Sequence, residues 1–264
     1  MKLSVVIPAH NEADCIESTV NSLTSVLGRE EIKYEILVIN DNSSDETEAI
    51  LASLASKDAG IRYINNTPPN GFGFAVRRGL ENFTGDAVAI YMADASDDPE
   101  DLVRFYRELE NGYDCVFGTR WRSGGRVYDY PAVKLVVNRL ANLFIQLAMQ
   151  IGYNDTTNAF KLYRRKVIEG VQPILSHHFN LTVELPLKAI VRGYNYKVVP
   201  NSWTNRTTGV SKLKIKEMGS RYLFIVLYCL IEKWLSRRDY HVSKAPQKQK
   251  NSNLLDGNVP LNTF

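Results

Sequence analysis

Acidic residues gather directly after a short apolar run in the segment AIYMADASDDPED, residues 89–101. They are Asp94, Asp97, Asp98, Glu100 and Asp101. Carboxylates at the carboxyl end of a strand can hold a divalent cation, and that cation can hold a diphosphate. A paired-carboxylate motif would begin with an aspartate at position 92, but the residue there is Met92. The segment therefore indicates either a metal site with one ligand missing or only a loop that leads into a helix.

The order of residues in DDPEDLVRFYREL supports the helix start. Pro99 suits the first position of a helix, and an aspartate before it can accept a hydrogen bond from the open backbone N–H groups. We expect a helix over 99–110 with either Asp97 or Asp98 as its cap. The segment SSDETEAILASL predicts a second helix start of the same kind, with Ser or Asp as its cap.

Polar segments follow four apolar runs that have the length of strands. These segments are PAHNE (8–12), NDNSSDET (40–47), MADASDD (92–98) and GTRWRSGG (118–125). In an open parallel sheet, ligands bind beyond the carboxyl ends of the strands. One polar strand end is ordinary loop chemistry, but four of them predict a single binding site at one edge of a sheet.

The elements that must position these segments alternate along the chain. Strands are predicted over 3–7, 34–39, 61–64, 87–92 and 113–117, and helices near 12–26, 45–57, 74–83 and 99–110. This alternation predicts an α/β fold with a mostly parallel central sheet flanked by helices. The segment NGFGFAVRRG has Gly71 and Gly73, but Val76 takes the third glycine position, so it is not the dinucleotide fingerprint.

Composition sets limits on the class of protein. The 264 residues are 44% hydrophobic and 23% charged, which is typical of a globular chain. A net charge of +3 is too small to favour a nucleic-acid partner. The cysteines Cys15, Cys115 and Cys229 form no CxxC pair, which favours a reducing compartment without structural zinc. The first residues lack the apolar run of a signal peptide, so we expect a cytoplasmic location.

Two long helices are predicted in the second half of the chain. Residues 131–152 are nearly all apolar except for polar residues at every fourth position: Lys134, Asn138, Asn142, Gln146 and Gln150. Residues 210–238 include an apolar run from Tyr222 to Ile231 with basic residues on both sides. This run is shorter than the roughly 20 residues of a membrane span.

Its composition instead favours an amphipathic helix over 216–238 that lies in a membrane interface. A pair of core or dimer helices is the alternative. The polar residues 239–264 indicate a disordered tail. We therefore expect a peripheral protein at the cytosolic face of a membrane, with a membrane-protein tether or a homo-oligomer as further possibilities.

Seven motifs occur in one order: VVIPAHNE, INDNSSDET, NGFGFAVRRG, MADASDDPE, GTRW, DTTNAFKLYRR and RTTGVSKL. Together they resemble the family 2 inverting glycosyltransferases of the Rossmann-like GT-A fold, in particular the dolichol-phosphate mannosyltransferases and their polyprenyl-phosphate relatives. The resemblance covers about residues 3–215, and we expect a catalytic domain over 1–215. The motif GFG departs from the commoner GKG, so Phe72 removes a possible cation.

The resemblance implies a role for individual residues. Catalytic roles fall on Asp94, Arg120, Arg206 and Lys212. The nucleotide sugar is expected at Pro8, His10, Glu12, Ile39, Asp41, Ala93, Asp94, Arg120, Arg206 and Lys212. The acceptor phosphate is expected at Arg120, Lys134, Asn138 and Ser211, and Mg²⁺ or Mn²⁺ at Asp94 and Ser96.

The implied activity is metal-assisted transfer of a hexose, with inversion, from a GDP- or UDP-sugar to a dolichyl or undecaprenyl phosphate. A lipid phosphate is already ionised and needs no strong base, whereas a hydroxyl acceptor needs a carboxylate such as Asp97 or Asp155. Asp155 is equally suited to fixing the turn that it opens. Two alternatives stay open: a glycosyltransferase that acts on a sugar or protein hydroxyl, and a non-catalytic nucleotide-sugar-binding relative, which Met92 alone supports.

Overall fold

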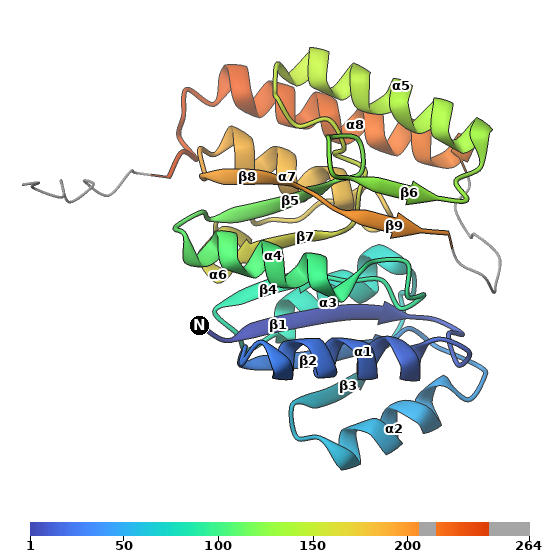
Figure 1. Cartoon of the computed structure of the whole chain (residues 1–264). Helices are drawn as coiled ribbons and strands as arrows, with labels where there is room; N and C mark the ends of the chain where they lie inside the picture. Colours follow the sequence, from blue (N-terminus) through green and yellow to red (C-terminus); the bar gives the residue numbers. More distant parts are fainter. Residues whose placement is uncertain (206–214, 243–264) are drawn as a thin grey trace, which may run out of the picture.

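The computed structural model describes residues 1–205 and 215–242 and is built on a seven-stranded sheet (Figure 1). The strands follow the order β3-β2-β1-β4-β7-β5-β8. The five strands predicted from the sequence are present as β1 (Leu3–Ala9), β2 (Tyr34–Asn40), β3 (Ile61–Asn65), β4 (Ala87–Ile90) and β5 (Cys115–Thr119). All seven residues of β1 are buried, which explains why its sequence is apolar except for Ser4 and does not alternate.

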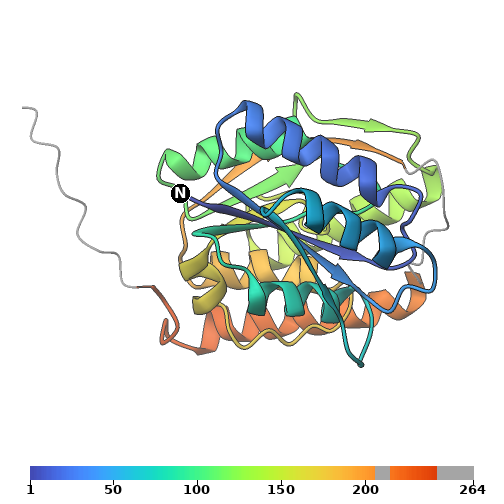
Figure 2. The same cartoon turned by 90° about the horizontal axis from the view of Figure 1, so that it is seen from below.

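Helices cover both faces of this sheet (Figure 2). One face packs against α1 (Ile16–Arg29), α2 (Thr47–Lys57) and α4 (Pro99–Glu110). The other face packs against α3 (Phe72–Asn82), α6 (Arg165–Gly170) and α7 (Leu181–Val191). The predicted flanking helices are thus confirmed, with α1 beginning later than expected because residues 12–15 form a turn.

The two long C-terminal helices form a further layer outside α7. They are α5 (Ala132–Met149) and α8 (Ile215–Leu235), which lie side by side in Figure 1. A separate apolar cluster joins them to α7 through Ile145, Leu187 and Ile225. A buried ion pair between Arg192 and Glu232, with Nε and Oε1 2.7 Å apart, also fixes α8. Both helices are therefore part of the folded domain and not appendages.

Four further strands of the structure were not predicted. The strand β7 (Lys161–Arg164) is inserted between β4 and β5 and runs antiparallel to both. The strand β8 (Tyr196–Pro200) extends the sheet parallel to β5. A small second sheet pairs β6 (Arg126–Tyr128) with β9 (Ser202–Thr204). Because β4 and β5 are both antiparallel to β7, they are parallel to each other, and the prediction of a mostly parallel sheet is confirmed.

The predicted start of α4 is also confirmed. Asp98 caps it by accepting a hydrogen bond from the Glu100 amide at 3.0 Å, and Pro99 is the first helical residue. Before α2, the carboxylate of Asp45 accepts from the amide and hydroxyl of Thr47 at 3.1 and 2.6 Å. The predicted tail over 239–264 lies almost entirely outside the described residues.

Candidate active site

The four polar strand ends lie at one edge of the sheet, as the sequence predicts. The strands β1, β2 and β4 are parallel neighbours, and β5 has the same direction on the far side of β7. The amide of Asp41 donates to the carbonyl of Ala9 at 2.7 Å, which joins the ends of β1 and β2. The backbone therefore brings PAHNE, NDNSSDET, MADASDD and GTRW into a single region.

On the β1–β2 side, Asp41 organises the loop that follows β3. One carboxylate oxygen accepts from the side-chain amides of Asn66 and Asn70, at 2.8 and 3.0 Å. The other oxygen accepts from the Gly71 amide at 2.7 Å. His10 lies beside this group, with its Nδ1 2.7 Å from the Asp41 carbonyl oxygen. Asp41 thus holds NGFG in place, while its predicted contact to a base or ribose stays a prediction.

Several residues assigned to the nucleotide sugar can offer it only their backbone. Pro8 and Ile39 are buried partners in the β1–β2 ladder, and the Ile39 side chain belongs to the core. Ala93 is also buried, and its carbonyl accepts from the Thr19 hydroxyl at 2.9 Å. Glu12 differs from these three residues because it is only half-buried. Its amide donates to the Thr47 hydroxyl at 3.0 Å.

The segment after β4 turns sharply and buries part of its acidic cluster. Ala95 has a φ of +54°, in the left-handed region, and the Ser96 amide donates to the Asp94 carboxylate at 3.2 Å. The Asp97 side chain is 5% exposed and accepts from the backbone N–H of Met92. Its Oδ2 has no hydrogen-bond partner among the described residues. Burial raises the pKa of Asp97 to about 8, and the charge of Asp94 acts in the same direction.

The residues at this turn fit a divalent cation that is shared with a diphosphate. Within residues 1–205 and 215–242, no group of three or more His, Cys, Asp or Glu side chains is arranged to hold a metal ion. Mg²⁺, however, commonly takes one or two carboxylates and completes its shell with waters and substrate phosphates. Asp94 and Ser96 supply such oxygens, and the buried Oδ2 of Asp97, which has no hydrogen-bond partner among the described residues, is a further oxygen nearby.

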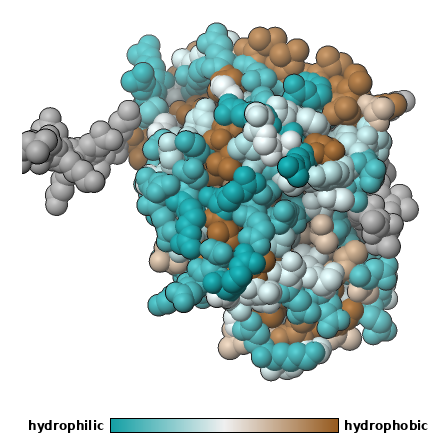
Figure 3. All heavy atoms as spheres, viewed as in Figure 1, coloured by the Kyte–Doolittle hydropathy of each residue, from teal (hydrophilic) through white to brown (hydrophobic). Residues whose placement is uncertain are grey.

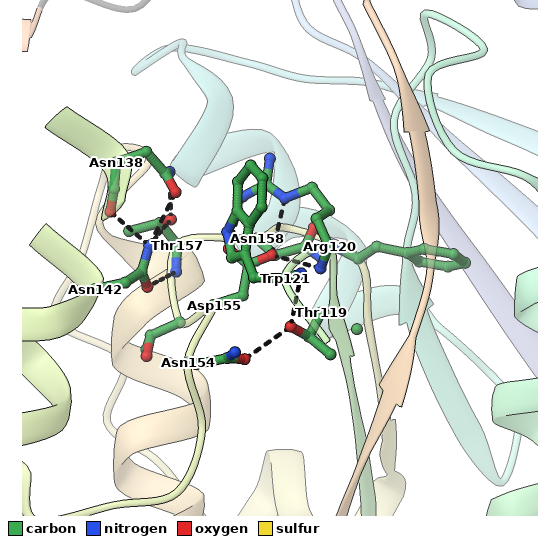
Figure 4. A network of polar contacts seen from close by, with 12 residues as sticks. Thr119, Arg120, Trp121, Asn138, Asn142, Asn154, Asp155, Thr157 and Asn158 are labelled. Carbon is green, nitrogen blue, oxygen red and sulfur yellow. Dashed lines mark hydrogen bonds and ion pairs between the residues drawn. The ribbon is translucent and has the colours of Figure 1, made fainter. Parts of the chain in front are cut away.

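At the end of β5, Arg120 is locked against Asp155 (Figure 4). The Arg120 Nε and Nη2 donate to the two carboxylate oxygens at 2.8 and 2.7 Å, and the Arg120 amide donates at 2.9 Å. Burial by itself lowers the pKa of this guanidinium, but Asp155 more than offsets that effect, so the pKa lies above its usual value. Arg120 is thus a fixed positive charge. Both oxygens of Asp155 are engaged, so this carboxylate fixes the turn and is not placed as a general base.

The same segment, residues 154–158, also holds α5. The Thr157 hydroxyl accepts from the side-chain amides of Asn138 and Asn142, at 2.8 and 2.9 Å (Figure 4). Asn138 and Lys134 share the inward side of α5, as their spacing predicts. Lys134 lies with its Nζ 5.6 Å from the centre of the Tyr130 ring. The motif DTTNAF therefore connects two of the residues assigned to the acceptor phosphate, Arg120 and Asn138.

A buried lysine stabilises the segment DTTNAF through its backbone carbonyls, and this role was not predicted from the sequence. Lys161, on β7, is 1% exposed, and its Nζ donates to the carbonyls of Thr156 and Thr182 at 3.0 Å and to that of Asn158. Burial lowers the pKa of this lysine to about 7, although the charge of Asp155 opposes the shift. Its place inside DTTNAFK is the signal that sequence reasoning could have used.

The remaining sequence assignments fall into two groups. Arg206, Ser211 and Lys212 lie outside the described residues. Phe72, which replaces the commoner lysine, stacks on Phe179 with ring centres 3.9 Å apart. This ring joins α3 to the segment before α7 and contributes no charge to the site.

Residues 4–171 match the family model described as Glycosyl transferase family 2. The match spans more than half of the chain, and the chain therefore belongs to glycosyl transferase family 2. Among curated relatives, the dolichol-phosphate mannosyltransferase of Pyrococcus furiosus is 31% identical over 222 residues, which are 82% of this chain and 60% of the relative. The polyprenol monophosphomannose synthase of Mycolicibacterium smegmatis is 31% identical over 215 residues, 79% of this chain and 80% of the relative.

Solved structures show the same fold at lower sequence identity. A mycobacterial protein superposes with a TM-score of 0.68 at 17% identity, covering 87% of this chain and 74% of that chain. Glucosyl-3-phosphoglycerate synthase from Mycobacterium tuberculosis, solved with Mn²⁺, uridine diphosphate and phosphoglyceric acid, has a TM-score of 0.65 at 18% identity. It covers 87% of this chain and 78% of that chain. The family and the GT-A fold predicted from the motifs are thus confirmed.

Proposed function

We propose that the protein transfers a hexose from a nucleoside-diphosphate sugar to a polyprenyl phosphate at the cytosolic surface of a membrane. The observation that carries this proposal is the orientation of α5. This helix turns its row of Lys134, Asn138 and Asn142 toward the site and most of its large apolar residues toward the outside. An acceptor that joins an anion to an apolar chain matches both sides.

The inverted pattern of α5 is pronounced. Asn142, in the polar row, is 1% exposed, whereas Val133 and Leu147 are 75% and 70% exposed. The other exposed apolar residues of α5 are Val136, Val137, Leu140, Leu143 and Phe144. A helix in water normally shows the opposite arrangement. The outer side of α5 is therefore suited to an apolar medium.

The neighbouring helix α8 extends this apolar surface. Its exposed apolar residues are Leu223, Phe224, Leu227, Ile231, Trp234 and Leu235. Figure 3 shows the hydrophobic atoms gathered along the upper edge of the molecule, where α5 lies. Contiguous exposed apolar surface of this kind marks an interaction site, and a membrane interface accommodates two helices that lie flat.

By length and composition, α5 is the one helix of the described ranges that could cross a membrane. Its inward side is nevertheless tied to the domain by the hydrogen bonds of Asn138 and Asn142 to Thr157. Because these bonds hold the helix against the catalytic edge, we infer that α5 and α8 rest in the interface together, as peripheral elements.

The chemistry needs little beyond positioning and charge. A phosphate monoester is ionised near neutral pH, so the acceptor can attack the anomeric carbon without a strong base. The difficulty is to bring two anions together. Lys134 and Asn138 serve that purpose, and the Arg120–Asp155 pair fixes the geometry of the acceptor end. A divalent metal at Asp94 and Ser96 would neutralise the charge that develops on the leaving diphosphate. Arg206 and Lys212 are assigned the same task by the family motifs.

The relatives support the substrate class. Two of them carry names that join mannose to dolichol phosphate or to polyprenol, and we extend this acceptor class to the present chain. The chain spans 60% of the length of the Pyrococcus furiosus relative. The names of the two relatives specify no donor nucleotide, so a GDP-sugar and a UDP-sugar are both tested.

The test is a donor panel. Purified protein with Mg²⁺ or Mn²⁺ and a short polyprenyl phosphate is given GDP-mannose, UDP-glucose or UDP-N-acetylglucosamine, and release of nucleoside diphosphate is measured. We expect release with one donor that requires the lipid phosphate and stops when a chelator is added. The proposal would be contradicted if folded protein released no nucleoside diphosphate with any of the donors. It would also be contradicted if the release were equal with and without the lipid phosphate.

A further inference from the structure

Three aromatic rings form a cluster beside the acceptor end of the site. Trp121 follows β5, Tyr130 precedes α5, and Trp203 belongs to β9. The ring centres of Trp121 and Tyr130 are 6.0 Å apart, and those of Tyr130 and Trp203 are 5.0 Å apart. We call these three residues the aromatic cluster. It connects the small β6–β9 sheet to the beginning of α5.

Three cations lie against the aromatic cluster. Arg120 and Arg139 each have their Cζ 5.3 Å from the centre of the Trp121 ring. Lys134 has its Nζ 5.6 Å from the Tyr130 ring centre and 6.0 Å from that of Trp203. Asp155 neutralises Arg120, but Arg139 forms no ion pair in the described part of the chain. The cluster therefore carries excess positive charge, which suits an anion.

Two features indicate that hydrogen-bond donors are available here. A cation–π contact uses the charge of a guanidinium and leaves its N–H groups able to donate. Arg139 is exposed, so its donors can reach a ligand. The Nε1 of Trp121 is buried and has no hydrogen-bond partner among the described residues. Such an unsatisfied donor is costly, and a ligand oxygen would satisfy it.

The surroundings of Arg139 define the class of ligand. Val136 and Leu140 flank it on α5 and are 57% and 60% exposed, and they belong to the apolar outer surface. An anion bound by Arg139 thus lies next to aromatic rings on one side and exposed aliphatic side chains on the other. A phosphate monoester of an apolar chain fits this arrangement better than a free sugar or a peptide.

We propose that Arg139 is an additional acceptor-phosphate residue and that the aromatic cluster holds the first apolar units of the acceptor. This deepens the proposed function, because it rests on an acceptor that is an amphipathic phosphate monoester. It adds a residue that the sequence motifs left unassigned. It also gives Trp121, Tyr130 and Trp203 a shared role as the path from the phosphate to the apolar surface.

The test measures ligand binding by calorimetry with the whole chain. The probes are farnesyl phosphate below its micellar concentration, farnesol, inorganic phosphate and the donor nucleoside diphosphate. The variants are Arg139→Gln, Arg139→Lys and Trp203→Ala. The control is Arg78→Gln, which removes an exposed arginine on α3 outside the cluster. Unchanged binding of the nucleoside diphosphate shows that each variant is folded.

We expect Arg139→Gln to weaken farnesyl phosphate binding roughly tenfold, because one charged hydrogen-bonding partner is lost. Arg139→Lys should retain most of the affinity, and Arg78→Gln all of it. Trp203→Ala should weaken farnesyl phosphate and farnesol alike, and inorganic phosphate less. Equal affinities for wild type and Arg139→Gln, or for wild type and Trp203→Ala, would overturn the proposal.

The outcome also separates this inference from the proposed function. Binding of farnesyl phosphate that depends on Arg139, without any transfer of sugar to it, would support the site and contradict the transferase activity. Transfer to farnesyl phosphate that is indifferent to Arg139 would support the activity and contradict the site. A wild-type protein that does not bind farnesyl phosphate would contradict both.

Discussion

Replacement of Asp155 by Asn tests whether the buried ion pair with Arg120 holds the acceptor end of the site together. The variant keeps the shape of the side chain and removes its charge. Asp155 is fully buried and Arg120 is 8% exposed, so water cannot replace the lost partner. The amide of Asn can accept from only one of the two donors, at Nε and Nη2, and turns its own N–H₂ toward the other.

The size of the effect follows from this burial. Breaking a buried pair by removing one partner costs about 3–5 kcal/mol, since the remaining charge is left uncompensated. A domain of this size is stable by about 5–15 kcal/mol, so most of the variant should still fold. The Arg120 guanidinium should lose its fixed orientation, and the KM for the acceptor should rise more than the KM for the donor.

The matched control is Glu100→Gln. Glu100 also forms a two-point contact with an arginine, at 2.7 and 2.8 Å from the Nη2 of Arg29, but this pair is exposed. We expect its loss to cost less than about 1 kcal/mol. The free energies of unfolding are measured by urea denaturation followed by circular dichroism. A difference between a variant and the wild type is accepted only if the two have the same m-value.

A double variant completes the cycle. The variant that combines Asp155→Asn with Arg120→Met should lose less free energy of unfolding than the two single variants together. With both partners replaced, no uncompensated charge is left buried. Strictly additive effects would refute the reasoning. So would a cost for Asp155→Asn that equals the cost for Glu100→Gln.

Three further predictions concern α5, the membrane surface and Lys161. Thr157→Val removes the acceptor shared by Asn138 and Asn142, and we expect a loss of about 1–3 kcal/mol and a higher acceptor KM, measured by denaturation and initial rates. Leu223→Glu with Leu227→Glu should leave folding intact, since both side chains are exposed, yet move the protein from liposomes to the soluble fraction in a flotation assay. Unchanged partition would contradict the interfacial helix. Lys161 has a native pKa of about 7, below its usual 10.5, so the unfolded chain binds more protons between these values. The free energy of unfolding should therefore rise with pH in that window, and Lys161→Met should abolish the rise, as denaturation on both sides of pH 7 would show.

Local order in the sequence determined most of the elements of this protein. The alternation of apolar runs and helical periods located five of the seven strands of the main sheet, because burial on both faces demands continuously apolar residues. The Asp98–Pro99 cap was readable because a helix start is settled by residues within one turn. The order of the strand ends was enough to predict a common site, since parallel neighbours end at the same edge.

Tertiary structure alone decided how the acceptor end is built. Arg120 and Asp155 are 35 positions apart, and only the insertion of β7 between β4 and β5 brings their segments together. The polar row of α5 was visible in the sequence, but a periodic pattern defines two sides of a helix without saying which one faces inward. Thr157, in the loop after α5, determines which side faces inward. The inward-facing side-chain amides of Asn138 and Asn142 need a hydrogen-bond partner, and the Thr157 hydroxyl supplies it.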